Sequence, residues 1–199
     1  IPLDETSLSK RFEMSRSPIR EALVRLSSEG LAVTLSNRST LVAPIDVGSF
    51  PRYVEALDFL RRVHMRLAAA NRTQADLSAM QECAKEFDKA VAEDDYLKIS
   101  ATNREFHMAI ADAGKNQYLA KPYREILDQG RRLVHLNFEH LRANSEDGAQ
   151  GLDHQDMIAA IEKQDAAKAE KLGHDHTRKF HDRFMNSLKA NYVSGFSFD

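Results

Sequence analysis

The chain has 199 residues, enough for two small domains or one large one. Its hydrophobic content of 42% and charged content of 29% are typical of a folded protein with a buried core and exclude a disordered chain. The formal net charge of -2 provides no overall basic field, so nucleic-acid binding would need a local patch. The single cysteine, Cys83, excludes an internal disulfide and a thiolate zinc cluster. No apolar run approaches the ~20 residues that span a bilayer, and we expect a cytoplasmic protein.

The first 45 residues predict a helix-turn-helix followed by a β-hairpin. Asp4 can cap a short helix that ends near residue 12, and Ser15 can cap a second helix that ends at Gly30. Residues 31–35 and 40–43 are rich in β-branched and apolar side chains and flank a turn-like segment. These elements together predict a winged helix-turn-helix domain.

The second of these helices has a charged face and an apolar face. Pro18 falls in its first turn, where its missing N–H would have no intrahelical partner. Arg16 and Arg20 are four residues apart and share one face, whereas Ile19 and Leu23 share another and can pack on a core. We therefore expect the arginines to point outward, as in a helix that enters a DNA groove.

The ordinary alternative is that Arg16 and Arg20 form a solvated helix face, paired with Glu13 or Glu21. Two exposed arginines alone do not exclude it. Under this alternative, four features would have to coincide by chance: the helix cap, the proline, the preceding short helix and the following hairpin. Their combination favours DNA binding.

These residues resemble the GntR family of bacterial transcription regulators. The resemblance rests on Leu3-Asp4-Glu5, Leu8, the run Ser15 to Leu23, Leu26 and Glu29-Gly30-Leu31. It implies that Arg16 and Arg20 contact DNA and that the wing tip enters the minor groove. We expect Ser15 and Ser17 to contact phosphates. It also implies that a further helix of the domain precedes residue 1.

The chain departs from that family at three positions near the expected DNA surface. Glu13 stands where relatives often have Gly, Asn or Asp, Ser39 where they have a glycine at the wing tip, and Thr6 where some carry another DNA-contacting arginine. Fewer phosphate contacts predict weaker and less salt-sensitive binding.

Residues 46–199 predict a second domain, separate from the first at 1–45. Long helical periodicity predicts helices at 49–71, 74–92, 95–113, 117–142, 152–163 and 166–191. Thr73 to Asp76 is typical of a capping box, Gly114 of a helix C-cap, and residues 145–151 of an exposed loop. The expected fold is thus mainly α, a winged helix-turn-helix followed by an all-helical antiparallel bundle.

Three histidines of the second domain are predicted to point into the bundle. His176 lies on an apolar stripe of its helix, His154 heads a buried face, and His107 follows Phe106 on a largely apolar helix. His174 has charged residues four positions away on both sides and is expected at the surface. Three inward imidazoles could bind a transition metal, or each could be a hydrogen-bonded core residue, and spacing alone leaves both open.

The second domain is similar to the helical effector domain of the FadR branch of GntR regulators. The pattern comprises Asn103-Arg104-Glu105-Phe106-His107, Asn116, His154 before Ile158-Ala159-Ala160-Ile161, Asp165 and His176. Many members bind a divalent metal through an aspartate and three histidines, with a small carboxylate completing the coordination. The resemblance implies that His107, His154 and His176 are ligands, with zinc or nickel as the expected metal.

Asn103 occupies the aspartate position of that pattern. It can offer a carbonyl oxygen or a hydrogen bond to metal or effector but lacks the negative charge, so metal affinity should fall. Arg131 and Arg132 are candidate partners of an effector carboxylate because a guanidinium matches carboxylate geometry. Only one of two adjacent helical residues can face the pocket, and the alternative is a surface pair with Asp128 or Glu139.

The predicted function is a homodimeric transcription regulator rather than an enzyme. A small organic acid bound in the helical domain would change the spacing of two winged helices on a double-stranded operator. One alternative is a metal-dependent hydrolase with the same histidines, although Glu105 should face away from His107. A second is a regulator for which the metal itself is the signal.

Overall fold

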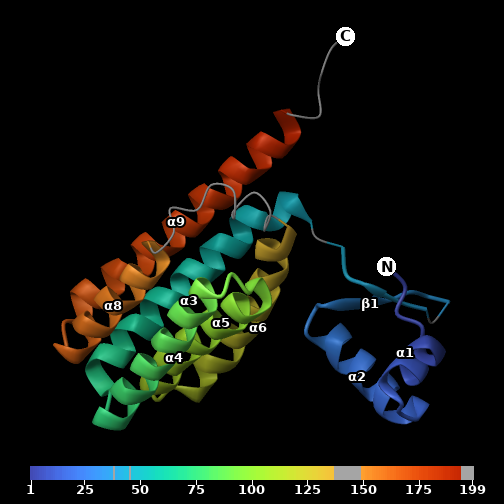
Figure 1. Cartoon of the computed structure of the whole chain (residues 1–199), viewed down its shortest axis with the longest axis horizontal. Helices are drawn as coiled ribbons and strands as arrows, with labels where there is room; N and C mark the ends of the chain where they lie inside the picture. Colours follow the sequence, from blue (N-terminus) through green and yellow to red (C-terminus); the bar gives the residue numbers. More distant parts are fainter. Residues whose placement is uncertain (38, 45, 137–148, 194–199) are drawn as a thin grey trace. The chain divides into compact units, whose positions relative to one another are not determined.

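The computed structural model describes residues 1–37, 39–44, 46–136 and 149–193. The chain divides into two compact units, Ile1–Val47 and Gly48–Asp199. The first contains two short helices and a pair of strands, and the second consists of long helices (Figure 1). The mainly helical fold with a winged N-terminal domain agrees with the prediction.

The N-terminal unit contains the predicted helix-turn-helix, formed by α1 (Glu5–Phe12) and α2 (Arg16–Ser28). Asp4 caps α1 by accepting a hydrogen bond from the Ser7 N–H at 2.7 Å, as predicted. Ser15 is the N-cap residue of α2, but its side chain makes no capping hydrogen bond, which corrects that detail. Gly30 follows α2 with a φ of 72°, a left-handed conformation that glycine adopts without a Cβ clash.

The wing consists of β1 (Ala32–Thr34) and β2 (Thr40–Val42), shorter by one or two residues than predicted. The strands are antiparallel, and Val33 pairs with Leu41. The N-terminal residues extend this sheet, since the Leu3 N–H donates to the Thr40 carbonyl at 2.8 Å. The small core beneath the wing contains Ile19, Leu23 and Ala32, so the apolar face of α2 is buried as expected.

The second unit is an all-helical bundle. After a short 3-10 turn (Val47–Ser49) its helices are α3 (Phe50–Asn71), α4 (Gln74–Ala92), α5 (Tyr96–Ala113), α6 (Gln117–Leu136), α8 (Ala149–Glu162) and α9 (Ala166–Val193). The capping box at Thr73 and the C-cap at Gly114 are present as predicted. Most predicted helices match within one or two residues at each end.

The connection between α6 and α8 differs in part from the prediction. Residues 137–142 of the helix predicted over 117–142 lie outside the described residues, as do residues 145–148 of the predicted loop. Residues 149–151, also predicted as loop, belong to α8, which corrects that assignment. Ala149 and Gln150 are good helix formers, and a single helical glycine at 151 costs only about 1 kcal/mol.

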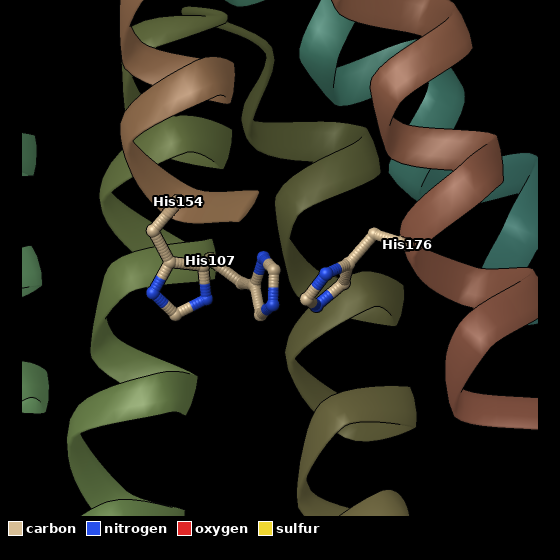
Figure 2. Close-up of side chains that lie close together, drawn as sticks. All are labelled: His107, His154 and His176. Carbon is tan, nitrogen blue, oxygen red and sulfur yellow. The ribbon is translucent and has the colours of Figure 1, made fainter. Parts of the chain in front are cut away.

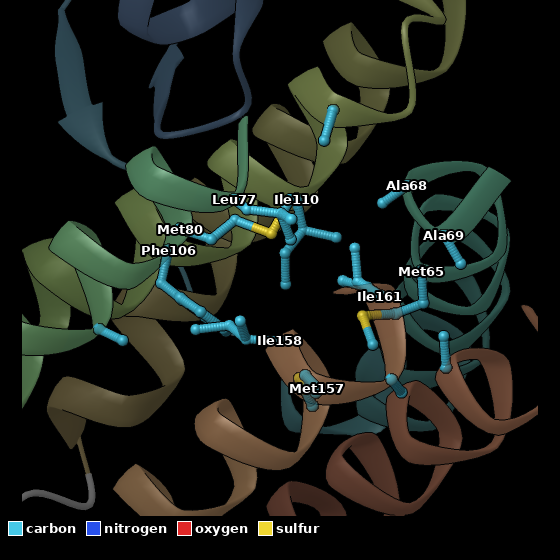
Figure 3. Packing of buried hydrophobic residues seen from close by; sticks show 14 residues of the cluster. Met65, Ala68, Ala69, Leu77, Met80, Phe106, Ile110, Met157, Ile158 and Ile161 are labelled. Atoms are coloured by element: carbon cyan, nitrogen blue, oxygen red, sulfur yellow. The ribbon is translucent and has the colours of Figure 1, made fainter. Parts of the chain in front are cut away.

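The bundle has two adjoining hydrophobic clusters. The larger, shown in Figure 3, packs α3, α4, α5 and α8 together. Its central side chains include Met65, Leu77, Met80, Phe106, Ile110, Met157 and Ile161. The smaller cluster joins α3, α5 and α6 around Leu57 and Tyr123. Phe106 belongs to the first cluster and Met108 to the second, so His107 lies on α5 where the two meet.

Membrane insertion finds no support in these helices. Within the described ranges, each helix is too short or too polar for a bilayer crossing.

Candidate functional site

The predicted DNA-contacting residues lie at the start of α2. Ser15, Arg16, Ser17 and Arg20 are all exposed. On the opposite face Ile19 and Leu23 retain only 6% and 5% of their accessible surface, which fixes the helix on its domain. The N-terminal turn of α2 therefore presents two hydroxyls and two guanidinium groups to solvent, the donors that contact phosphates and base edges.

Arg20 forms an ion pair with a residue that is distant in the sequence. Its Nε and Nη2 donate to the two carboxylate oxygens of Glu5, each at 3.1 Å. The hydrogen bond from Arg20 lowers the pKa of the Glu5 carboxyl. The pairing considered from sequence, with Glu13 or Glu21, is therefore wrong for Arg20, because α1 brings Glu5 across the turn.

The three predicted histidines converge from three helices of the bundle. His107 comes from α5, His154 from α8 and His176 from α9, and their rings face one another (Figure 2). One ring nitrogen from each lies within 4.8 Å of the others. The ring centroids are 5.2 to 5.7 Å apart. His174 is exposed, as predicted, and its Nδ1 lies 2.9 Å from Asp58.

All three imidazoles are buried and held in the neutral form. Burial lowers the pKa of His107 and His154 well below the usual value, and the positive charge of Arg61 and the neighbouring imidazoles add to this. Nε2 of His107 and both ring nitrogens of His154 have no hydrogen-bond partner among the described residues. Because His154 stacks on Phe106 with centroids 3.9 Å apart, apolar surface surrounds these polar atoms. Among the described residues His154 thus has no hydrogen-bonded core role, and each unmet nitrogen costs about 1–3 kcal/mol.

His176 differs because a carboxylate orients its ring. Its Nδ1 lies 3.3 Å from Asp153, which also accepts a hydrogen bond from Lys179 at 2.5 Å. Burial would raise the pKa of the Asp153 carboxyl, but the bonds from His176 and Lys179 lower it to about 2. Burial lowers the pKa of His176 to about 4 although Asp153 opposes the shift. With the Nδ1 proton directed at Asp153, the free lone pair of His176 is on Nε2.

A cavity of ≈ 110 Å³ adjoins His176 and is lined by residues of α3, α5, α6 and α9. Arg61 of α3 lies in its wall and is only 5% exposed. It donates from Nε to the Tyr123 hydroxyl at 3.3 Å and from Nη1 to Thr177 Oγ1 at 3.0 Å. Both acceptors are neutral, so this buried guanidinium has no acidic counterion in the described part of the chain.

Sequence reasoning missed Arg61, although a signal for it exists. Leu57, Arg61, His64 and Ala68 are three or four residues apart and are all buried on α3. A charged residue on such an apolar stripe indicates a functional position, because burying an unpaired charge is costly. Arg183 of α9 also lines the cavity and was missed.

Of the predicted effector-binding residues, Asn103 and Arg131 line the cavity and Arg132 does not. Arg131 donates from Nε to Ser100 Oγ at 3.1 Å. Asp128, one of the two surface partners considered from sequence, binds Arg104 instead, and the other, Glu139, lies outside the described residues. Asn103 lies one helical turn before His107, on the same face of α5.

The arrangement offers little to a hydrolytic reaction. Glu105 exposes 61% of its side chain and pairs with Arg104, so it points away from the histidines.

A larger, open depression of ≈ 670 Å³ lies around Gly114 to Tyr118, and none of the predicted site residues lines it.

A winged helix-turn-helix with an exposed arginine face, joined to a helical domain with a buried polar cavity, defines a DNA-binding transcription regulator with an effector domain. Comparison with known proteins agrees. Residues 2–42 match the family described as bacterial regulatory proteins, gntR family, and residues 53–179 match the FCD domain. The chain belongs to the gntR family of bacterial regulatory proteins and carries an FCD effector domain.

Named relatives are similar over most of the chain. The Nta operon transcriptional regulator of Aminobacter aminovorans is 24% identical over 190 residues, covering 94% of this chain and 86% of the relative. The transcriptional repressor RspR of Escherichia coli is 24% identical over 195 residues, covering 96% and 82%. Among solved structures, E. coli McbR/YncC shares the fold with a TM-score of 0.77 at 19% identity, covering 98% of this chain and 89% of that one.

Proposed function

We propose that this regulator binds a divalent transition metal through His107, His154 and His176, and that a small carboxylate effector completes the site. The observation that carries the proposal is the convergence of three buried imidazoles, with one ring nitrogen of each within 4.8 Å of the others, and with unpaired nitrogens on His107 and His154. Neutral imidazole nitrogens suit zinc and nickel. When bound, the metal would supply a positive charge that attracts an anion.

The protein side chains prepare this site in two ways. Asp153 fixes the ring of His176 and increases the basicity of its free nitrogen, as outer carboxylates do in metal sites. Arg61 provides a buried positive charge next to the histidines, which suits the carboxylate of an effector. Asn103 contributes a neutral amide instead of a carboxylate, so a metal here would depend more strongly on an anionic ligand.

The mechanism we propose is a change of geometry in a homodimer. Effector binding at the α3, α5, α6 and α9 cavity would alter the distance between two winged helices, and half-sites are read at a fixed spacing on DNA. Arg16 and Arg20 would contact base edges or phosphates, and Ser15 and Ser17 phosphates. Sedimentation equilibrium of the full chain should give about twice the 22.5 kDa monomer mass.

The first test is elemental analysis of the untagged full chain, purified without added metal. We expect about one zinc or nickel per chain, lost in His154→Ala and kept in His174→Ala, whose histidine lies at the surface. Less than a tenth of an equivalent in the wild type, before and after incubation with zinc chloride and acetate, would contradict the metal site.

The second test separates an effector from a metal signal. DNA selected by the protein from a random-sequence pool is titrated in gel-shift assays, with metal alone and with metal plus acetate or succinate. The proposal requires that the acid changes DNA affinity at constant metal. A change produced by metal alone would instead support a metal-sensing regulator.

A further inference from the structure

Two guanidinium groups lie beside the three histidines. Arg61 and Arg183 line the cavity next to His176, and no acidic side chain is among its described lining residues. Arg61 is buried, and its two hydrogen-bond partners, Tyr123 and Thr177, are neutral. Metal ligands in proteins are negative or neutral groups, so two guanidinium groups beside such ligands oppose the entry of a cation.

The positive charge of Arg61 acts on all three imidazoles. Burial is the main cause of their lowered pKa values, and the charge of Arg61 lowers the pKa of each ring further. Arg183 has the same effect on the pKa of His176. A charge that disfavours a proton on these nitrogens also disfavours a metal cation there, for the same electrostatic reason.

Asp153 contacts this cluster, but its negative charge is already shared. Its carboxylate oxygens lie 3.3 Å from His176 Nδ1 and 2.5 Å from Lys179 Nζ. Water screens part of the Lys179 charge, since this side chain is 52% exposed. Burial lowers the pKa of Arg183, whereas Asp153 raises it. One carboxylate thus serves Lys179 and Arg183 together, and Arg61 has no acidic partner in the described part of the chain.

Two further arginines line the cavity, but neither adds an unpaired buried charge. Arg104 is neutralised by Asp128, whose carboxylate oxygens lie 2.5 and 3.1 Å from its nitrogens. Arg131 is exposed and donates to the hydroxyl of Ser100. The positive charge at the histidines therefore comes from the first two arginines.

Asn103 adds no negative charge to this balance. It lines the cavity one helical turn before His107. Its amide can offer a carbonyl oxygen, which is a neutral ligand. The three imidazoles are neutral as well, so none of these four groups offsets the charge of a cation. A divalent metal alone would place two more positive charges beside the guanidinium groups.

We propose that metal and anion bind this site cooperatively, because Arg61 and Arg183 repel the metal until an anion neutralises them. This inference rests on the proposed metal site and carboxylate effector and adds a condition on their binding. By linkage, the anion would raise metal affinity by the same factor as the metal raises anion affinity. The regulator would then respond to the coincidence of both ligands, and metal that stays bound through purification would carry an anion with it.

The test is the zinc affinity of the full chain, stripped of metal with EDTA, dialysed and titrated against a chromogenic chelator. Perchlorate is the background anion because it coordinates metals weakly, and a second series contains acetate at the same ionic strength. The chelator reports free zinc and so corrects for zinc acetate in solution. Acetate should tighten zinc binding at least about tenfold, since a nearby charge changes the affinity for a proton by about one to three pKa units.

The arginine variants separate charge repulsion from ordinary ligation of zinc by acetate. Arg183→Gln should tighten zinc binding in perchlorate at least about tenfold and should reduce the effect of acetate, because one repelling charge is lost. Arg61→Gln should act in the same direction, provided that circular dichroism shows a folded chain. Arg62→Gln is the matched control, since Arg62 is half exposed and pairs with Glu170. It should leave the zinc affinity unchanged in both series.

The outcomes separate this inference from the metal site on which it rests. Tighter zinc binding in Arg183→Gln, together with a smaller effect of acetate, supports the proposal. Equal or weaker zinc binding in that variant overturns the role of the guanidinium charge while the metal site stands. A wild-type zinc affinity that acetate does not change overturns the cooperativity. Failure of the wild type to bind zinc even with acetate contradicts the metal site and this inference with it.

Discussion

Acidification should destabilise the metal-free helical domain through its buried histidines. His176 has a folded-state pKa of about 4, against about 6.5 in an unfolded chain. Above pH 6.5 neither state binds a proton at this residue, so stability is fully present. As the pH falls from 6.5 towards 4, the unfolded chain takes up a proton that folded His176 excludes, and the folded state loses stability.

The size of this effect follows from the shift. One pKa unit corresponds to about 1.4 kcal/mol, so lowering the pH from 7 to 5 should remove about 2 kcal/mol of unfolding free energy through His176 alone. The pKa values of His107 and His154 are shifted in the same direction, and these residues add to the loss. Asp153, with a pKa of about 2, stays ionised throughout this range.

Urea unfolding of the EDTA-treated full chain, followed by circular dichroism at pH 7 and pH 5, measures this loss. His176→Gln should reduce the difference between the two pH values by about 2 kcal/mol, because glutamine does not titrate. His174→Gln is the control, since His174 exposes 49% of its side chain. The reasoning fails if His176→Gln keeps the full pH dependence, or if His174→Gln removes it.

Three further predictions concern other parts of the structure. Arg20→Ala should weaken operator binding by about 1–3 kcal/mol in a gel-shift titration if its contact is bidentate to a guanine. Arg25→Ala is the control, since Arg25 lies on the same helix but pairs with Glu29, and it should change the affinity little. Equal losses of affinity in the two variants would remove Arg20 from the base contacts. Gly130→Ala should lower stability by about 1–3 kcal/mol through overlap with the Tyr53 hydroxyl, and an unchanged Tm would mean that Tyr53 moves freely. Thr73→Ala removes the capping box of α4 and should cost about 1 kcal/mol in thermal unfolding; full stability in this variant would show that the box is dispensable.

Local sequence patterns were sufficient for much of the fold. Caps such as Asp4 and Thr73 act on residues three positions away, so their hydrogen bonds are visible in the sequence itself. Periodicity likewise placed His107, His154 and His176 inside the bundle, because helical spacing determines which face a residue occupies. The predicted start of α8 at residue 152 is too late, because the helix begins at Ala149 and continues through Gly151.

Contacts between distant segments could not be obtained in the same way. The pairing of Arg20 with Glu5 spans 15 residues and depends on how α1 packs against α2. Arg61 is buried because α6 and α9 cover it, through Tyr123 and Thr177, and these contacts span 62 and 116 residues. Whether three inward histidines meet is a question of helix packing, and only the structure shows that the rings face one another.

The Glu5–Arg20 pair has a consequence for how the regulator would search a genome. The pair uses Nε and Nη2 of the guanidinium, and Nη1 makes no hydrogen bond with Glu5. A paired arginine carries little net charge towards the surrounding phosphates, so it adds little to sequence-independent attraction. It is also already held in one orientation, which reduces the rotamer entropy lost when it meets a base. Arg20 would therefore add little to residence on random DNA, and recognition at this position would depend on the base presented to it.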